Sequence, residues 1–367
     1  MSLPCFFFVW RVKRCMQSTQ LMKPQETTFA TVPMQLVGPL KITGPEMDGE
    51  VMVPLATYET PLWASVNRGA KVSMLAGGIK AVVVDDRMTR SILLEAPDAE
   101  AAVCTASALA NRQPELASVV ASSSRFAQLL DIHTQCVANL MYIRFEMRTG
   151  DASGHNMVTK AADALIDWIL TEYSDLKYVS VSGNFCSDKK PTAVNGILGR
   201  GKNVITEVRI PRDICSRVLK TTPEKIVDIN IKKNLIGTML AGGIRSANAH
   251  YANMLLAFYL ATGQDAANIV EGSQGFVHAQ VTGDALYFSA TVPNIIVGTI
   301  GSGKDLDFVR RNLAQMDCVK EREAGQNARR LAVICAATVL CGELSLLAAQ
   351  TNRGELMRAH VKMERKG

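Results

Sequence analysis

The sequence predicts an α+β fold: a large, mainly helical domain around a small sheet, with an inserted ferredoxin-like β-α-β-β-α-β small domain. Three observations predict it. The chain has 367 residues, which is enough for two domains at ~150 residues each. Strand and helix patterns follow one another as β-α-β-β-α-β over residues 88–182. A pattern with almost no charge at 245–262 predicts a buried helix, and a long Ala/Leu-rich helix is predicted at 327–349.

The small domain is predicted from changes in hydrophobic period along the insert. Asp98 is a suitable helix N-cap, because its carboxylate can accept hydrogen bonds from the free N–H groups of the first turn. Met157, Leu165 and Ile169 share one face of the second helix. The expected elements are a strand at 89–95, a helix from 98 to 111, strands at 126–135 and 138–148, a helix at 156–173 and a strand at 178–181.

The remaining residues form the large domain. Small residues such as Gly69 and Ala70 dominate its first helix pattern, which suits close helix contact or an approach of the backbone to a ligand. The expected elements are a strand at 51–53, a helix at 61–75, a strand at 204–210, a helix at 245–262, strands at 286–292 and 295–300 and a helix at 327–349. The expected divisions are a loose N-terminal tail at 1–33, the large domain at 34–87 and 183–367, and the small domain at 88–182.

Composition narrows the class of protein. Hydrophobic residues make up 48% and charged residues 20% of the chain, which is typical of globular proteins and excludes wholesale disorder, collagen and coiled coil. The net charge of +6 is not gathered into a basic stripe, so we expect no nucleic-acid partner. Nine irregularly spaced cysteines predict free thiols and no zinc site. No apolar run reaches the ~18 residues of a membrane span, so we expect no membrane and a cytoplasmic location.

A glycine-rich segment, Gly298-Thr-Ile-Gly-Ser-Gly-Lys-Asp305, follows an apolar strand and precedes a helix, as a phosphate-binding P-loop would. Asp305, however, stands where a P-loop has the Ser or Thr that binds magnesium. A P-loop nucleotide hydrolase is therefore a weak alternative, and a glycine-rich turn that touches a ligand is favoured. No GxGxxG fingerprint of a Rossmann fold occurs.

Candidate catalytic groups lie in three other places. The loop Ser180–Thr192 carries Asp188 and Lys189, and such a loop can hold a carboxylate or an oxyanion by charge-assisted hydrogen bonds; a solvated charge cluster is the other interpretation. Glu59 at a strand–helix junction and Asp265 after the buried helix are possible general acids, if burial raises their pKa. Asp265 could equally be a helix cap. A lone histidine in a polar tail, such as His360, is usually a surface residue.

Together these segments resemble the 3-hydroxy-3-methylglutaryl-CoA reductase family, and in detail its class I branch. The most specific stretches are SGNFCSDKKP from Ser182 to Pro191, NAHYAN from Asn248 to Asn253 and GQDAA from Gly263 to Ala267. The stretches that resemble the family, in its order, lie at 51–71, 124–160, 180–202, 233–253, 263–267, 298–303 and 342–360. The family's fold, a large helical domain with a ferredoxin-like insert, agrees with the insert predicted from periodicity.

The resemblance implies roles for individual residues. Lys189 would be the cationic oxyanion stabiliser, Glu59 the acid at the aldehyde stage, Asp265 the group between them, and His360 the proton donor to the departing CoA thiolate. The implied binding residues for hydroxymethylglutaryl-CoA are Ser65, Asn67, Arg68, Lys71, Arg90, Ser182, Asp188, Lys190, Lys220, Lys233 and Asn253. The implied NADPH site in the small domain contains Ser124, Arg125, Phe126, Asp151, Gly154, Asn156 and Met157.

The activity implied is NADPH-dependent reduction of hydroxymethylglutaryl-CoA to mevalonate and CoA, in isoprenoid precursor synthesis, with no metal. A homodimer or tetramer with the site at the subunit interface is expected. Some positions depart from the family's pattern. Tyr58 and Thr60 flank the glutamate, Ser153 and His155 replace two methionines, and Arg245 replaces a glycine. The family's N-terminal dimer motif is missing before residue 34, and Lys366 replaces the phosphorylated serine of animal and plant enzymes. A catalytically weakened CoA-ester-binding protein is therefore the main alternative.

Overall fold

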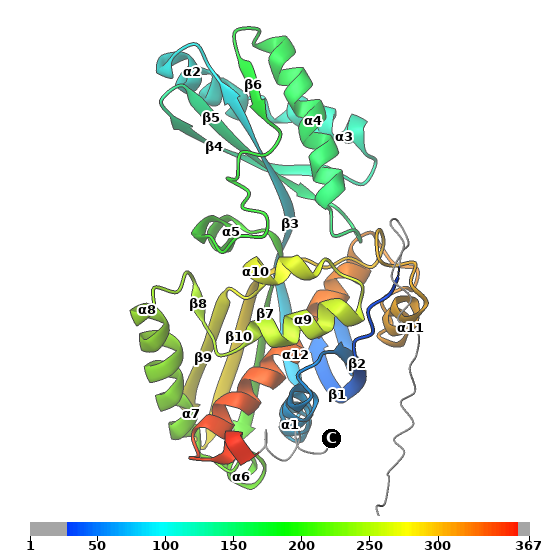
Figure 1. Cartoon of the computed structure of the whole chain (residues 1–367), viewed down its shortest axis with the longest axis vertical. Coiled ribbons are helices and arrows are strands. Elements are labelled where there is room, and N and C mark those ends of the chain that lie inside the picture. The colour runs from blue at the N-terminus through cyan, green and yellow to red at the C-terminus, as the bar shows by residue number, and fades with distance from the viewer. Residues whose placement is uncertain (1–27, 359–367) are drawn as a thin grey trace, which may run out of the picture. The chain divides into compact units, whose positions relative to one another are not determined.

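The computed structural model describes residues 28–358, and its strands form two sheets that share one long strand, β3 (Ile79–Glu95) (Figure 1). Residues 28–32 belong to a separate N-terminal unit and contain no helix or strand, and the second unit begins at Pro33. Most of the tail predicted at 1–33 thus lies outside the described residues. The fold is mixed α and β, as predicted.

The larger sheet is more extensive than the sequence predicts. Its strand order is β2-β1-β3-β7-β10-β9-β8, and neighbours are antiparallel except for the parallel pairs β1–β3 and β8–β9. The additional strands are β1 (Met34–Gly44), β2 (Met47–Ala56), β7 (Gly201–Pro211), β8 (Ser246–Ala247), β9 (Gly275–Thr282) and β10 (Ala285–Ile295). Pro54 lies within β2, which is an edge strand, and edge strands tolerate proline.

Three helices build the core against this sheet: α1 (Pro61–Leu75), α9 (Tyr251–Ala261) and α12 (Gln326–Gln350). Helix α12 packs against the other two and against β7 and β10. It is long and apolar enough to cross a membrane, but 94% of its apolar window is buried inside the fold. Gly69 of α1 meets α12 directly, since a Cβ there would lie 2.1 Å from the Cys341 carbonyl oxygen. The small residues of α1 therefore serve close helix contact.

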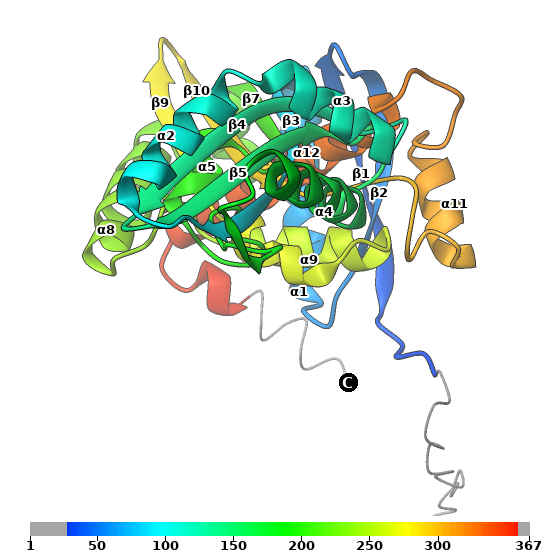
Figure 2. The same cartoon turned by 90° about the horizontal axis from the view of Figure 1, so that it is seen from above.

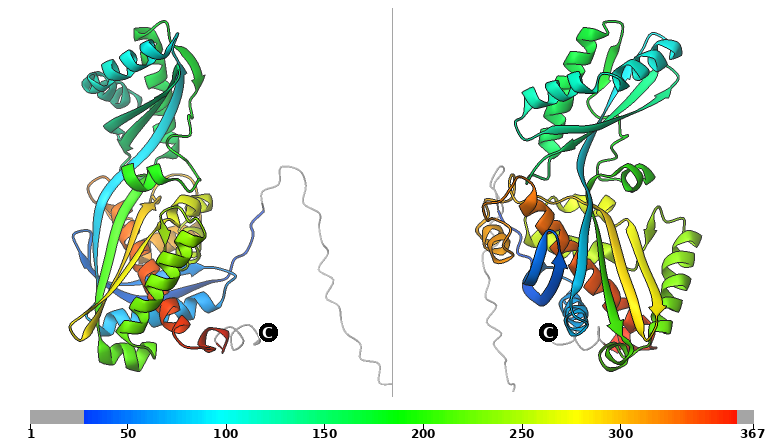
Figure 3. Two further views of the ribbon diagram at one scale, coloured as in Figure 1. Left: turned by 90° about the vertical axis from the view of Figure 1, so that its left-hand side faces the viewer. Right: turned by 180° about the vertical axis from the view of Figure 1, so that it is seen from behind.

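The second sheet continues from the same long strand beyond Arg87. Its order is β4-β5-β3-β6, with every pair antiparallel. The strands and helices of this part are α2 (Ala99–Ala110), α3 (Gln113–Ser123), β4 (Gln128–Val137), β5 (Leu140–Arg148), α4 (His155–Glu172) and β6 (Lys177–Ser180). Figure 2 looks onto these elements from above, and Figure 3 shows β3 passing from one sheet into the other from two more sides. The side chains between this sheet and its helices form a second hydrophobic cluster, around Ile92, Ile143 and Leu165.

Two predicted elements differ from the structure. The helix predicted at 245–262 begins only at Tyr251, because Arg245 has a left-handed φ of 50° and Ser246–Ala247 pair with β9. The strand predicted at 295–300 stops at Ile295, and Ile300 makes only an isolated bridge to Ala152.

The remaining short helices are α5 (Ala193–Leu198), α6 (Arg212–Ile214), η1 (Cys215–Leu219), α7 (Pro223–Ile229), η2 (Asn230–Gly237), α8 (Thr238–Leu240), η3 (Ala266–Asn268), α10 (Ile269–Gly272) and α11 (Asp307–Gln315).

Candidate active site

The loop between β6 and α5 carries the charged residues that the sequence singles out; residues 181–192 are called the lysine loop below. Lys189 Nζ lies 2.8 Å from Asp265 Oδ2, at the turn that follows α9. This hydrogen bond raises the pKa of Lys189. Burial opposes ionisation of Asp265, but the bond from Lys189, the bond from the Ala267 N–H and the nearby positive charge together outweigh it and lower the pKa of Asp265. The pair is therefore a fixed ammonium beside a carboxylate.

Asp188, the preceding residue, is held from two sides. Arg200 Nη2 lies 2.6 Å from Asp188 Oδ1, and His155 Nε2 lies 3.7 Å from the same oxygen. Arg200 is buried and also donates to the Thr89 carbonyl oxygen. Burial alone would raise the pKa of Asp188, but the surrounding positive charges, that of Arg200 first among them, and the bond from Arg200 together bring it below its usual value. Asp188 thus connects the lysine loop to the residue that precedes β7 and to the first residue of α4.

His155 is one of the departures from the family's methionines, and its surroundings are polar. Its Nδ1 lies 3.4 Å from Ser153 Oγ. Its Nε2 is buried without a hydrogen-bond partner among residues 28–358. Burial and the nearby Arg200 charge lower the pKa of His155 to about 4. The imidazole is consequently neutral at physiological pH.

Buried groups that the sequence analysis missed hold the lysine loop in place. Arg144 on β5 donates to the Phe185 carbonyl oxygen at 2.9 Å and to Asn195 Oδ1 at 3.2 Å. Glu271 on α10 accepts from the Lys189 backbone N–H at 3.2 Å. Arg144 could have been noticed in the sequence, because it is a charged residue within an apolar strand pattern. For Glu271 and Arg200 the local sequence carries no such signal, since their bonds to Lys189 and Thr89 span 82 and 111 positions of the chain.

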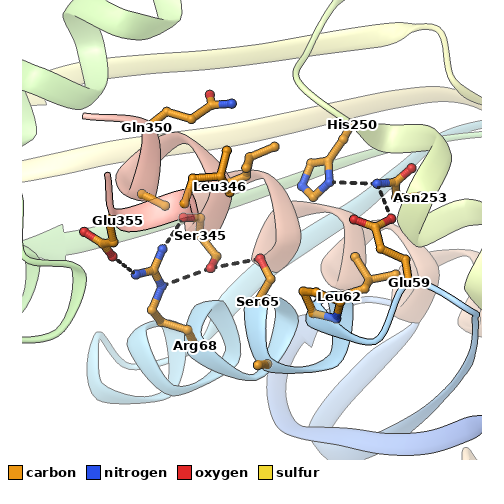
Figure 4. A pocket seen from close by; sticks show the side chains of 14 residues that line it. Glu59, Leu62, Ser65, Arg68, His250, Asn253, Ser345, Leu346, Gln350 and Glu355 are labelled. Carbon is orange, nitrogen blue, oxygen red and sulfur yellow. Dashed lines mark hydrogen bonds and ion pairs between the residues drawn. The ribbon is translucent and has the colours of Figure 1, made fainter. Parts of the chain in front are cut away.

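A pocket of about 370 Å³ lies between α1 and the end of α12. Figure 4 shows its two groups of polar side chains. Arg68 Nε and Ser65 Oγ both bond to Ser345 Oγ, and Arg68 also pairs with Glu355 at 2.6 Å. The lining residues are Glu59, Pro61, Leu62, Ala64, Ser65, Arg68, His250, Asn253, Ser345, Leu346, Ala349, Gln350, Glu355 and Leu356. His250, Ser345 and Glu355 were missed as pocket residues.

Glu59 lies at the other end of this pocket and is exposed. It accepts a 2.8 Å hydrogen bond from Asn253 Nδ2 and makes no ion pair within the described part of the chain. Asn253 is in the first turn of α9, whereas Asp265 follows the last turn. Eight residues of helix separate Asn253 from Ala261, or ~12 Å. The structure therefore brings Lys189 and Asp265 together but leaves Glu59 apart from them.

Some of the predicted substrate residues line the pocket, and the others lie outside it. Ser65, Arg68 and Asn253 line the pocket, and Lys190 Nζ donates to the Asp188 carbonyl oxygen. Asn67 instead accepts from the Gly38 N–H, and Arg90 donates to Thr159. Lys233 is half-buried, its Nζ donates to Asn234, and burial lowers its pKa. The others lie outside the pocket lining, with Lys71 and Lys220 exposed and Ser182 half-buried.

The predicted cofactor residues occupy two places in the described chain. Ser124, Arg125 and Phe126 follow α3, and the Arg125 guanidinium lies 4.7 Å from the Phe126 ring centre. Asp151 Oδ1 accepts from the Ala328 N–H, so Asp151 caps the start of α12. The remaining three belong to the start of α4: Gly154 is the N-cap with φ 95°, Asn156 is exposed and Met157 packs against the second hydrophobic cluster.

The glycine-rich segment 298–304 packs beside these residues and does not form a P-loop. Thr299 N–H donates to the Asp151 carbonyl oxygen, and a Cβ at Gly298 would lie 2.4 Å from the Ser153 nitrogen. Lys304 Nζ donates to the Gly263 carbonyl oxygen and to Gln264. The lysine that would bind phosphate in a P-loop is therefore directed at the turn before Asp265.

Other expectations concern metal, thiols and the C-terminal tail. Asp131, His133 and Glu146 are close enough to share a cation, but Glu146 already accepts from Arg144 and Arg87. This cluster is thus an ion-pair network. All seven cysteines within the described residues are free. His360 and Lys366 lie outside the described residues.

Comparisons with known proteins agree on one family. Residues 22–365 match the family model described as hydroxymethylglutaryl-coenzyme A reductase. The 3-hydroxy-3-methylglutaryl-coenzyme A reductase of Aeropyrum pernix is 45% identical over 92% of this chain and 80% of its own length. The protein of the same name from Pyrococcus abyssi is 44% identical over 91% and 82%. A class II reductase of Streptococcus pneumoniae, solved with NADPH bound, has the same fold, with a TM-score of 0.72 at 19% identity over 90% of this chain and 88% of that one.

Proposed function

Because the chain belongs to the hydroxymethylglutaryl-coenzyme A reductase family, we propose that it reduces 3-hydroxy-3-methylglutaryl-CoA to mevalonate and CoA with NADPH. The observation that carries the proposal is the Lys189–Asp265 pair, an ammonium fixed by a carboxylate on a firmly held loop. The relatives named above are curated under this enzyme name. Mevalonate is the precursor of isoprenoids, which places the reaction in that synthesis.

Lys189 stabilises the negative charge that develops on the substrate oxygen. Reduction of a thioester to an alcohol passes through a hemithioacetal and an aldehyde, and the carbonyl oxygen becomes anionic at each reduction. A preorganised ammonium lowers the energy of such a transition state more than that of the substrate. Asp265 orients this ammonium, and its own charge helps to keep Lys189 protonated.

Proton delivery is assigned to Glu59 at the aldehyde stage and to His360 at the departing thiolate. A histidine with a pKa near 6.5 suits protonation of a thiolate. A general acid must keep its proton near neutrality, which burial and a neighbouring carboxylate favour. Glu59 is exposed and lies at the far end of α9 from Asp265. We therefore propose a homodimer or tetramer in which a neighbouring subunit completes the site.

The substrate is proposed to lie along the pocket and the lysine loop. Ser65 and Arg68 would contact the CoA side, with Asn67, Lys71 and Lys220 near its phosphates. The hydroxymethylglutaryl part would be held by Ser182, Asp188, Lys190, Lys233, Asn253 and Arg90. The pocket has an apolar wall of α12 residues beside the Arg68 guanidinium, which suits a ligand with an apolar arm and an anionic end.

The residues proposed to hold NADPH are Ser124, Arg125, Phe126, Asp151, Gly154, Asn156 and Met157. The surroundings fit a dinucleotide, because Gly154 opens the N-terminus of an 18-residue helix, where free N–H groups attract phosphate. Bound NADPH would supply the hydride for each reduction. Arg125 is exposed beside Phe126 and can pair with the 2′-phosphate that distinguishes NADPH from NADH.

We further propose that residues 88–182 are a ferredoxin-like small domain inserted between the two parts of the large domain, 34–87 and 183–367. The order β4-β5-β3-β6 with helices between the strands supports it. So does the separate hydrophobic cluster, to which, among the described residues, only Ile296 contributes from outside. A cytoplasmic location is proposed from the free cysteines and the burial of α12.

The test is the loss of NADPH absorbance that depends on hydroxymethylglutaryl-CoA, together with release of CoA. A reductase consumes two NADPH for each CoA released. A CoA-ester-binding protein would bind the ester in calorimetry and leave NADPH unchanged. A nucleotide hydrolase would release phosphate from ATP, which the direction of Lys304 argues against.

A further inference from the structure

Glu271 lies beneath the lysine loop, fully buried in α10. Its Oε1 accepts from the Lys189 N–H at 3.2 Å, from Asn268 Nδ2 at 3.0 Å and from Arg200 Nε at 3.4 Å. Its Oε2 has no hydrogen-bond partner among residues 28–358, and neither has Asn268 Oδ1, which is buried as well. Two buried acceptors on neighbouring side chains are thus unsatisfied, although each normally costs about 1–3 kcal/mol.

The charges around Glu271 are balanced without it. Two cations face this cluster, and each has a closer carboxylate partner: Lys189 pairs with Asp265 at 2.8 Å, and Arg200 with Asp188 at 2.6 Å. An ionised Glu271 would be a third carboxylate for two cations. A buried charge without its own partner is strongly unfavourable.

The neighbouring titratable groups supply no further positive charge. His155 also faces Asp188, but it is neutral because burial lowers its pKa to about 4. Tyr259 on α9 is fully buried, and burial raises its pKa well above the usual value, so that it too is neutral. No other cation in the described chain pairs with Glu271.

We propose that Glu271 is held as a neutral carboxylic acid and that, in this form, it is the positioning residue for Lys189. One proton on Oε2 turns an unsatisfied acceptor into a donor for Asn268 Oδ1. Oε1 continues to accept from Asn268 Nδ2 and from the Lys189 N–H. The acid and the amide then form a cyclic pair with both of its bonds made. Burial also raises the pKa of Glu271.

The consequence for Lys189 rests on its proposed role in catalysis. Lys189 has a left-handed φ of 56°, a conformation that costs about 1–2 kcal/mol for a residue with a side chain. The bond from its N–H to Glu271 Oε1 holds the backbone there. A neutral Glu271 accepts this bond without placing a second negative charge beside the Lys189 ammonium. The positive charge of the ammonium therefore stays available to stabilise the substrate oxyanion.

Substitutions that preserve or remove the acid's shape test the proposal. Glu271→Gln is also neutral and can donate to Asn268, so we expect kcat within about threefold of the wild type. Glu271→Ala removes the anchor and should lower kcat by about tenfold or more with a smaller change in KM. Equal losses of kcat in both variants would overturn the proposal, because only an ionised Glu271 requires its charge.

Infrared difference spectra give a reading that does not depend on activity. Protein labelled with isotopic glutamate should show the carbonyl band of a protonated acid at neutral pH, and Glu271→Gln should lack it. Glu146 is the matched control, since it is buried but forms ion pairs with Arg144 and Arg87; Glu146→Gln should lose only carboxylate bands. Carboxylate bands alone for Glu271 would overturn the proposal. An acid band in a protein without reductase activity would contradict only the proposed function.

Discussion

Lys189 combines a strained backbone with an ammonium that already has a partner, Asp265, at 2.8 Å. We expect Lys189→Met to lower kcat by about 10²-fold or more, because the ammonium acts on charge that appears in the transition state. Binding of the CoA ester should stay within about tenfold. Steady-state kinetics and calorimetry measure the two effects. Equal losses of rate and binding would make Lys189 a substrate anchor only.

Arg125 is exposed at the end of α3, so its substitution should leave the fold intact. Arg125→Ala should raise KM for NADPH much more than KM for NADH, because only NADPH offers a 2′-phosphate to the guanidinium. Arg148, also exposed at the end of β5, is the control, and Arg148→Ala should leave the ratio unchanged. An unchanged ratio in the Arg125 variant would remove it from the cofactor site.

His155 makes the stability of the protein depend on pH on the acid side. Its pKa is lowered from 6.5 to about 4 in the folded chain, so the unfolded chain binds the proton more readily. The free energy of unfolding should therefore fall as pH drops from 6.5 towards 4, by on the order of 1–3 kcal/mol. Denaturation by urea at several pH values should show a smaller decline for His155→Gln. Identical declines would mean that His155 does not titrate there.

At the scale of elements, α1 and α12 touch at Gly69. A Cβ at this position would lie 2.1 Å from the Cys341 carbonyl oxygen, so Gly69→Ala must push two core helices apart. Such overpacking typically costs about 1–3 kcal/mol, measurable as a lower Tm. Gly237 in η2 is the matched control, because its Cβ would lie 3.6 Å from the nearest atom. Gly237→Ala should leave Tm unchanged or raise it slightly.

Elements with strong local signals were predicted well. Helix α1 has the predicted ends, and Asp98 caps α2 as expected, accepting from the Ala101 N–H. Helix α3 was missed, since only Leu116 and Val120 of its 11 residues are buried and its apolar period is weak. The larger sheet was underestimated because β1 and β9 carry mixed apolar and polar patterns, although each forms a hairpin with the strand that follows it.

The residues of the candidate site also divide into those with a local sequence signal and those without one. Lys189 and Asp265 could be found because each lies in a specific motif, and the structure pairs them. Arg200 and Glu271 could not, because their roles come from contacts across 111 and 82 positions of the chain. Sequence alone also could not show that Glu59 lies at the opposite end of α9 from Asp265.

The whole molecule is needed to explain the separation of Glu59 from Lys189. If a neighbouring subunit completes the site, two inactive variants should restore each other. Glu59→Gln and Lys189→Met, co-expressed, should give mixed oligomers with some intact sites and measurable NADPH oxidation. Each variant alone, and the two proteins mixed without subunit exchange, should remain inactive. Absence of activity in mixed oligomers isolated by dual tags would place all catalytic groups in one chain.

Strand β3 belongs to both sheets, and a register shift between Val83 and Asp85 interrupts its pairing with β7. Beyond Arg87, the eight residues of β3 from Met88 to Glu95 extend for ~26 Å. A bend of β3 at the register shift would therefore move this segment as a whole. A bend of about 5° at the shift would displace Glu95, ten residues or ~33 Å beyond Asp85, by about 3 Å. If residues 124–157 hold NADPH as proposed, a small bend at one irregular point of one strand is sufficient to change the distance over which the hydride is transferred.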